Sequence, residues 1–162
     1  SVMANQALNY LSTGSSPERT GNYHPNLTPY QVFDCADGHI IIATGNDGQY
    51  QRLCGLLGLA DMAASPEFLK NSDRIKNRDK MVSRLMQKTK TFSKDALLSA
   101  CEAAGVPAGP INDMAEVFAD PQVIARKMQL NLNGIPSVRS PFQFSEGSLN
   151  LTRPSPSLGE YD

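Results

Sequence analysis

Residues 29–44 read Pro29-Tyr-Gln-Val-Phe-Asp-Cys-Ala-Asp-Gly-His-Ile-Ile-Ile-Ala-Thr44. Two short runs rich in β-branched and aromatic residues, 29–35 and 39–44, flank the tripeptide Ala36-Asp-Gly38. Asp-Gly favours the positive φ that a tight turn between antiparallel strands requires. The stretch therefore predicts a β-hairpin, and it is the strongest local indication of fold in the chain.

Helical patterns lie on both sides of this hairpin. Apolar spacing, an N-cap at Ser93 and stop signals at Gly58 and Gly105 predict helices over the segments 49–57, 77–91 and 93–105. The opening residues Val2 to Leu11 also have a helical pattern. Residues 12–28 are rich in turn-forming residues and predict a long connection.

The second half of the chain continues this mixture of short elements. Residues 106–112 contain two prolines and a glycine, which predicts an edge strand or an extended crossing. Asp113 and Asp120 are in position to cap two helix starts. Strands are expected at 129–132 and 138–144. The predicted fold is an α/β (α+β) domain with a short, mostly antiparallel sheet and flanking helices.

Composition narrows the class of protein. A chain of 162 residues is long enough for one core, so one domain is the default. Fifteen basic and 16 acidic residues give a formal charge of −1, which provides no electrostatic reason to expect nucleic acid or a membrane surface as partner. Three widely spaced cysteines suggest neither disulfides nor a zinc site. With no membrane-spanning run or signal peptide, we expect a cytoplasmic protein without metal.

The candidate functional site is the loop Gly45-Asn46-Asp47-Gly48-Gln49, between a predicted strand and a predicted helix. Glycines let the main chain approach a ligand closely, and N–H groups at a helix start favour an anion or oxyanion. Such a loop can serve acyl transfer. The same residues are also ordinary turn and N-cap residues, so spacing alone leaves both interpretations open.

Eight segments resemble, in order and spacing, the class III CoA-transferases. These segments are Arg19-Thr-Gly-Asn-Tyr-His-Pro25, Pro29-Tyr30, Ala36-Asp-Gly38, Gly45-Asn-Asp-Gly-Gln49, Asn77-Arg78, Ala104-Gly-Val-Pro-Ala-Gly-Pro-Ile-Asn112, Phe118-Ala-Asp-Pro-Gln122 and Leu158-Gly-Glu160. The family is that of the carnitine and bile-acid CoA-transferases, with formyl-CoA transferase and α-methylacyl-CoA racemase among its members. The resemblance runs through nearly the whole chain.

The resemblance implies an architecture larger than this chain. It implies a large CoA-binding domain, a small α/β domain, two long linkers and an interlocked homodimer. On this basis residues 1–28 are expected to be a helix and linker from the large domain, residues 29–133 the small domain, and residues 134–162 the start of the return linker. A start without methionine and a proline-rich end suggest a fragment of a longer protein.

The resemblance also implies a mechanism in which an aspartate attacks an acyl-CoA and carries CoA as an enzyme thioester. That nucleophile is expected upstream of Ser1, so we assign it to none of the acids present, including Asp34, Asp37, Asp47 and Asp61. The substrates would be an acyl-CoA and a carboxylic acid, with CoA transferred between them. The isolated chain is predicted to be inactive.

The resemblance implies that, in the transferases, the loop equivalent to residues 45–49 closes over the catalytic aspartate and shields its acyl intermediates. In this chain Asn46 and Asp47 stand where the loop of the family is richer in glycine. In the racemase branch a glutamate occupies the equivalent of Asp47 and works in acid/base chemistry, which gives the main alternative. The other interpretation of Asp47 is structural: its side chain would cap the start of the helix that follows.

Other residues have a structural and a functional interpretation. His24 can act near neutral pH, but in a linker we expect it to hydrogen-bond to backbone. His39 is expected at a solvent-facing hairpin position. Arg19 and Arg78 can bind CoA phosphates or carboxylates, although a surface or interdomain salt bridge is the simpler role.

A third hypothesis is a non-catalytic structural or dimerisation module when the chain is isolated. The opening helix would expose Val2, Leu8 and Leu11, and self-association would cover them.

Overall fold

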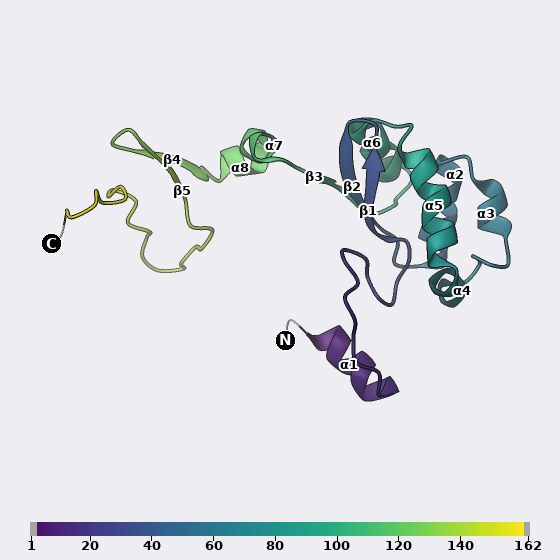
Figure 1. The fold of residues 1–162 in the computed structure, drawn as a ribbon. Helices are drawn as coiled ribbons and strands as arrows, with labels where there is room; N and C mark the ends of the chain where they lie inside the picture. The colour runs from purple at the N-terminus through teal and green to yellow at the C-terminus, as the bar shows by residue number, and fades with distance from the viewer. Residues whose placement is uncertain (1–2, 161–162) are drawn as a thin grey trace. The chain divides into compact units, whose positions relative to one another are not determined.

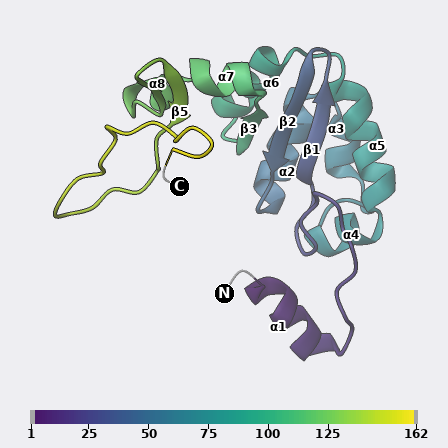
Figure 2. The ribbon, with the colours of Figure 1, turned by 60° about the vertical axis from the view of Figure 1, so that its left-hand side comes forward.

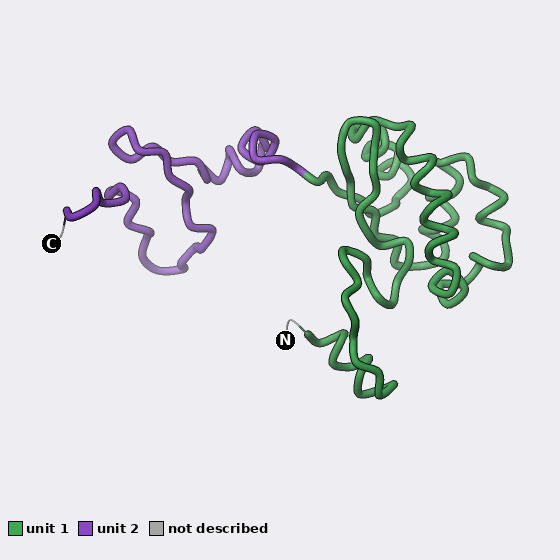
Figure 3. The backbone as a smooth tube through the Cα atoms, viewed as in Figure 1, with its two compact units in different colours: residues 1–111 green, residues 112–162 purple. Residues whose placement is uncertain are grey.

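The computed structural model describes residues 3–160. The chain divides into two compact units at the junction between Ile111 and Asn112 (Figure 3). The first unit contains a three-stranded sheet and most of the helices, and the second contains two short helices and a hairpin. The fold is mixed α/β with short antiparallel sheets and flanking helices, as predicted.

The first sheet has the order β1-β2-β3, with both pairs antiparallel. Its strands are β1 (Tyr30–Cys35), β2 (Gly38–Ala43) and β3 (Ala108–Ile111). In the β1–β2 hairpin Phe33 lies opposite Ile40, and Gly38 has a φ of 154°. The predicted hairpin and the proline-containing third strand at the edge are therefore confirmed.

Five helices of the first unit lie between β2 and β3 in the chain (Figure 1). They are α2 (Asp47–Leu56), α3 (Ala60–Ala64), α4 (Asn71–Lys76), α5 (Arg78–Thr89) and α6 (Lys94–Ala103). The predictions for α2, α5 and α6 are confirmed to within two residues at each end. Neither α3 nor α4 was expected, because both are short and neither has a side-chain cap at its N-terminus.

The hydrophobic core lies on one face of this sheet, where helices α2, α5 and α6 pack (Figure 2). Side chains alternate between the two faces of a strand, so Phe33, Ile40 and Ile42 all point to the helical side. Fully buried side chains from the helices complete the core: Tyr50, Leu53, Cys54, Met62, Met81, Leu85, Leu97 and Cys101. The start of α2, which carries the candidate loop, is therefore anchored directly against the core.

The second unit consists of α7 (Met114–Ala119), α8 (Pro121–Ala125), β4 (Gln129–Leu132) and β5 (Ile135–Val138). Asp113 and Asp120 cap the two helices, as predicted. The prediction of a strand at 138–144 is wrong. Asn133 and Gly134 both have positive φ and close a two-residue turn, so the second strand begins directly after them.

Helix α1 (Ala4–Thr13) begins the described part of the chain and has no buried residue. Side-chain hydrogen bonds between Asn9 and Asn26 connect it to the segment before β1. Its predicted residue Val2 lies outside the described residues. The predicted domain boundaries at residues 28 and 133 concern a larger protein and stay a prediction. Among residues 3–160 no helix is both long and apolar enough to cross a bilayer.

Candidate functional site

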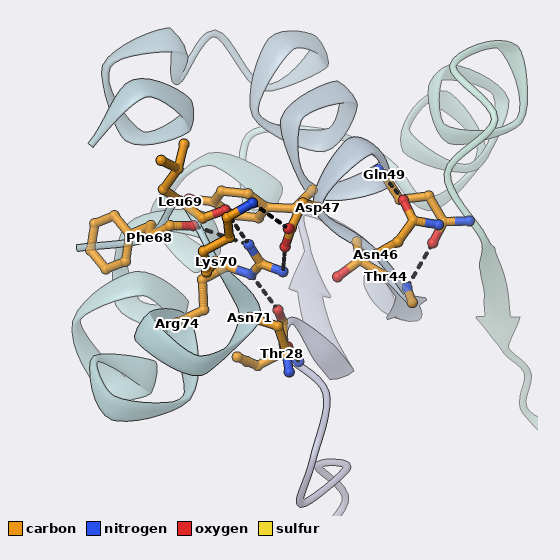
Figure 4. Close-up of polar contacts among 12 residues, drawn as sticks. Thr28, Thr44, Asn46, Asp47, Gln49, Phe68, Leu69, Lys70, Asn71 and Arg74 are labelled. Atoms are coloured by element: carbon orange, nitrogen blue, oxygen red, sulfur yellow. Dashed lines mark hydrogen bonds and ion pairs between the residues drawn. The ribbon is translucent and has the colours of Figure 1, made fainter. Parts of the chain in front are cut away.

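The candidate loop joins β2 to α2, and Figure 4 shows its residues Asn46, Asp47 and Gln49. The residue before the loop is firmly held. Thr44 is buried, and both its backbone N–H and its Oγ1 donate hydrogen bonds to the carbonyl of Pro29, at 2.9 and 2.8 Å. Asn46 is extended and caps α2, since its Oδ1 accepts a hydrogen bond from the Gln49 N–H at 2.9 Å. The helix therefore begins at Asp47, and the cap that we considered for Asp47 is supplied by Asn46 instead.

Two of the five N–H groups of the loop, those of Gly45 and Gln49, donate hydrogen bonds within the loop. The N–H of Gly45 donates to Gln49 Oε1 at 2.6 Å, so the glutamine side chain closes the loop back on itself. Within the described part of the chain, the N–H groups of Asp47 and Gly48 have no hydrogen-bond acceptor. They lie in the first turn of α2, where the helix leaves its N–H groups unpaired and favours negative charge. Within the described loop, those two groups and the N–H of Asn46 are the donors available for an oxyanion.

The Asp47 carboxylate is engaged in ion pairs. Arg74 Nη2 lies 2.9 Å from Oδ1, and Lys70 Nζ lies 3.6 Å from Oδ2. The hydrogen bond from Arg74 holds the pKa of Asp47 below its usual value, so the group is a carboxylate at neutral pH. A side chain held in this way is poorly suited to give up or take a proton.

The other three acids that we considered also have structural partners. Asp34 Oδ1 lies 3.2 Å from His39 Nδ1, and its Oδ2 lies 3.2 Å from Lys90 Nζ, whose hydrogen bond lowers the pKa of Asp34. Asp37 Oδ1 accepts the Lys94 N–H at 2.7 Å, next to the start of α6. Asp61 pairs with Arg84 Nη2 at 2.6 Å. None of the three lies in the 45–49 loop.

His24 has the backbone role that we expected. Its Nδ1 accepts hydrogen bonds from the N–H groups of Asn26 and Leu27, at 3.1 and 3.2 Å. Its ring stacks on Tyr30, with the ring centroids 5.2 Å apart. The imidazole therefore shapes the turn that leads into β1. His39 is exposed on the hairpin, also as expected.

Arg78 forms no ion pair with any residue of the described chain, and the surface or interdomain salt bridge that we expected stays a prediction. Its Nη2 instead donates to the carbonyls of His24 and Pro25, at 3.0 and 3.2 Å, and its guanidinium lies over the Tyr23 ring. Burial lowers the pKa of Arg78, and the two carbonyls compensate part of the cost of removing its guanidinium from water. Arg19 is exposed, and among the described residues no ion pair involves it.

The cysteines are poor candidates for nucleophiles. All three are free and buried. Burial raises the pKa of Cys101 to about 11 and raises the pKa values of Cys35 and Cys54 as well, so thiolates are rare at neutral pH. Within residues 3–160, no group of three or more His, Cys, Asp or Glu side chains is arranged to hold a metal ion.

Sequence reasoning missed Arg74, the residue that holds the loop most closely. It lies in the segment Asn71-Ser-Asp-Arg-Ile-Lys76, whose composition is that of a solvated helix. Only 1% of the Arg74 side chain is exposed. Nothing in the local pattern distinguishes this arginine from its neighbours, because its partners come from distant parts of the chain.

Comparisons with known proteins give matches over nearly the whole chain. A family model described as CoA-transferase family III matches residues 1–162. The chain is 45% identical to a succinate–glutarate CoA-transferase of Agrobacterium fabrum, over 99% of this chain and 41% of that protein. It is 34% identical to an acetyl-CoA:oxalate CoA-transferase of Acetobacter aceti, over 84% of this chain and 35% of that protein.

Solved structures give the same result. A CAIB/BAIF family protein from Brucella suis superposes with a TM-score of 0.87 at 48% identity, over 98% of this chain and 42% of that chain. The chain thus spans about two fifths of the length of these relatives.

Proposed function

The chain belongs to CoA-transferase family III, and we propose that the whole protein carrying it transfers CoA from an acyl-CoA to a carboxylic acid. The observation that carries the proposal is the 45% identity over 99% of the chain to a succinate–glutarate CoA-transferase. The relatives are named for several acids, among them succinate, glutarate and oxalate. Short dicarboxylic acids are therefore the first class of acceptor to test.

In the proposed reaction an aspartate carboxylate attacks the acyl-CoA thioester, giving a mixed anhydride and CoA thiolate. The thiolate then attacks the enzyme's carbonyl, which releases the donor acid and leaves CoA on the aspartate as a thioester. The acceptor carboxylate reverses these two steps, takes the CoA and restores the aspartate. We assign the nucleophile to a part of the protein outside this chain, a choice supported by the structural partners of Asp34, Asp37, Asp47 and Asp61.

The contribution of this chain is the 45–49 loop. We propose that the N–H groups of Asp47 and Gly48 stabilise the oxyanion that forms on the attacked carbonyl. The loop would also exclude water, which otherwise hydrolyses the anhydride or the thioester. The packing of α2 against the core supports this role, because preorganised donors need a rigid base.

The proposal extends to assembly and location. We propose an interlocked homodimer in which residues 29–133 form the small domain, with linkers at 1–28 and 134–162. A reducing, cytoplasmic location is supported by the three unpaired cysteines. We propose no metal in the mechanism.

The racemase alternative requires acid/base work at Asp47. The ion pairs to Arg74 and Lys70 favour the transferase instead, since they hold the carboxylate ionised and occupy both oxygens. Epimerisation of a 2-methylacyl-CoA by the whole protein would reverse this preference.

The test uses the whole protein, succinyl-CoA as donor and a panel of dicarboxylic acids as acceptors. After incubation, hydroxylamine or borohydride traps an enzyme-bound thioester. We expect exchange of CoA and an adduct on one aspartate that lies outside residues 1–162. The isolated chain is the control, and it should neither exchange CoA nor form the adduct. Exchange by the isolated chain, or an adduct within it, would overturn the assignment.

A further inference from the structure

Arg74 is a buried cation that binds three separate segments of the chain (Figure 4). Its Nε donates to the carbonyl of Thr28 at 2.9 Å, and its Nη2 donates to Asp47 Oδ1 at 2.9 Å. Its Nη1 donates to the carbonyls of Phe68 and Leu69, at 3.1 and 3.2 Å. A planar guanidinium with five N–H donors suits this arrangement, whereas a lysine ammonium cannot reproduce it.

Arg74 contacts α2 at two places. Besides its ion pair with Asp47, its guanidinium carbon lies 4.5 Å from the centroid of the Tyr50 ring, which is fully buried. A buried charge is costly unless it is paired, so the Asp47 carboxylate compensates for the burial of the arginine. The first turn of α2 is thereby fixed to α4.

Both sides of the loop are thus attached to the same short segment. Before the loop, Thr44 donates two hydrogen bonds to the carbonyl of Pro29. Within the loop, Asp47 reaches Thr28 through Arg74. The loop is held to residues 28–29 at two points, and only one of these depends on a charge pair.

We propose that Arg74 is a positioning residue, which holds the 45–49 loop through Asp47 in the geometry that keeps water from the acyl-enzyme. This inference rests on the proposed function, and it adds a residue that the sequence analysis did not single out. Loss of the ion pair frees the first turn of α2 while Thr44 still holds the end of β2. The expected result is leakage of acyl groups to water, more than loss of the fold.

The test compares three variants of the whole protein. Asp47→Asn keeps an oxygen acceptor but removes the charge, and Arg74→Lys keeps the charge but removes the planar fork. Asp61→Asn is the matched control, because Asp61 also lies in the first turn of a helix and pairs with an arginine, and among the described residues its side-chain partner is Arg84, which lies outside the loop. Thermal unfolding first establishes that each variant is folded.

Two readouts decide the proposal. With succinyl-CoA and glutarate as probe substrates, the ratio of thioester hydrolysis to CoA transfer should rise about tenfold or more in Asp47→Asn and Arg74→Lys, and stay unchanged in Asp61→Asn. Hydrogen–deuterium exchange of the amides of residues 45–50 should accelerate in the same two variants. Should Arg74→Lys fail to fold, Asp47→Asn decides alone.

The outcomes separate this inference from the proposed function. A folded Asp47→Asn variant with the wild-type hydrolysis ratio and wild-type loop exchange would overturn the positioning role. A wild-type protein that transfers no CoA would overturn the proposed function, and the exchange of the loop amides would still decide whether Arg74 holds the loop.

Discussion

At the scale of single residues, the chemistry of Asp47 depends on its partner more than on its own position. A carboxylate at a helix start is stabilised by the unpaired N–H groups, whatever lies nearby. Here it also neutralises Arg74, which is only 1% exposed and would otherwise be a buried unpaired charge. The same residue therefore belongs both to the candidate site and to the stability of the first unit.

This dual role predicts a specific response to acid. Arg74 holds the pKa of Asp47 below its ordinary value of 3.8, so the ion pair contributes stability above that value and loses it as pH falls through the lower, folded-state pKa. The free energy of unfolding of the wild type should fall below about pH 4 more steeply than that of Asp47→Asn. Urea denaturation between neutral and acidic pH measures both slopes. Parallel slopes would show that the pair does not stabilise the fold.

Asp61→Asn provides the comparison at the surface. Its ion pair with Arg84 is exposed and should be screened by salt, so this substitution should have little effect at high ionic strength.

At the scale of elements, local sequence accounts for those that carry their own signals. The Asp37-Gly38 dipeptide predicted the β1–β2 hairpin, whose two turn residues are Ala36 and Asp37. Ser93, Asp113 and Asp120 predicted three helix starts. The Asn133-Gly134 turn carried an equally good signal that our interpretation did not use, so β5 was misplaced. Helices α3 and α4 have no such signal in the local sequence. Their buried residues, Met62 and Arg74, hold them to the rest of the unit instead.

A pair of glycine substitutions tests how these elements are held. Gly38 has a φ of 154°, and an added Cβ would lie 2.7 Å from Cδ of Lys94, so Gly38→Ala should lower the free energy of unfolding by about 1 kcal/mol. Gly55 lies in α2 with nothing within 4 Å of the added atom, so Gly55→Ala should raise it by about 0.5–1 kcal/mol. Chemical denaturation gives both values. Equal effects of the same sign would contradict this account of the hairpin turn.

At the scale of the whole molecule, the two units differ in their interiors. The first contains the cluster of buried apolar side chains, whereas none of the described residues from 112 to 160 is buried. Burial of apolar surface is the main source of stability, so the second unit has little of its own.

Hydrogen exchange should reveal this difference. Amides in β1, β2 and α5 should exchange about a hundredfold or more slowly than amides in α7, α8, β4 and β5 of the isolated chain. Mass spectrometry of peptides from the two units measures the rates. Similar protection in both units would show that the second unit is stabilised by contacts other than a buried core.

The exposed face of α1 predicts self-association of the isolated chain. Leu8 and Leu11 are 64% and 77% exposed, which leaves apolar surface in contact with water. We expect oligomers or aggregation in sedimentation experiments at high concentration, and less of both in a Leu8→Glu, Leu11→Glu double variant. A clean monomer of the unaltered chain would contradict the prediction.

The sequence by itself determined the hairpin, the capped helices, the family and the loop at residues 45–49, because each is encoded by neighbouring residues through turn geometry, capping or a motif in fixed order. Only the tertiary structure decided that Arg74 is buried, that it pairs with Asp47, and that Arg78 binds carbonyls in place of an acid. Those facts depend on residues 27 to 54 positions apart that meet only when the chain folds. Those distant neighbours decide whether a charged side chain lies in water or in the interior, and the local composition of the sequence does not encode that outcome.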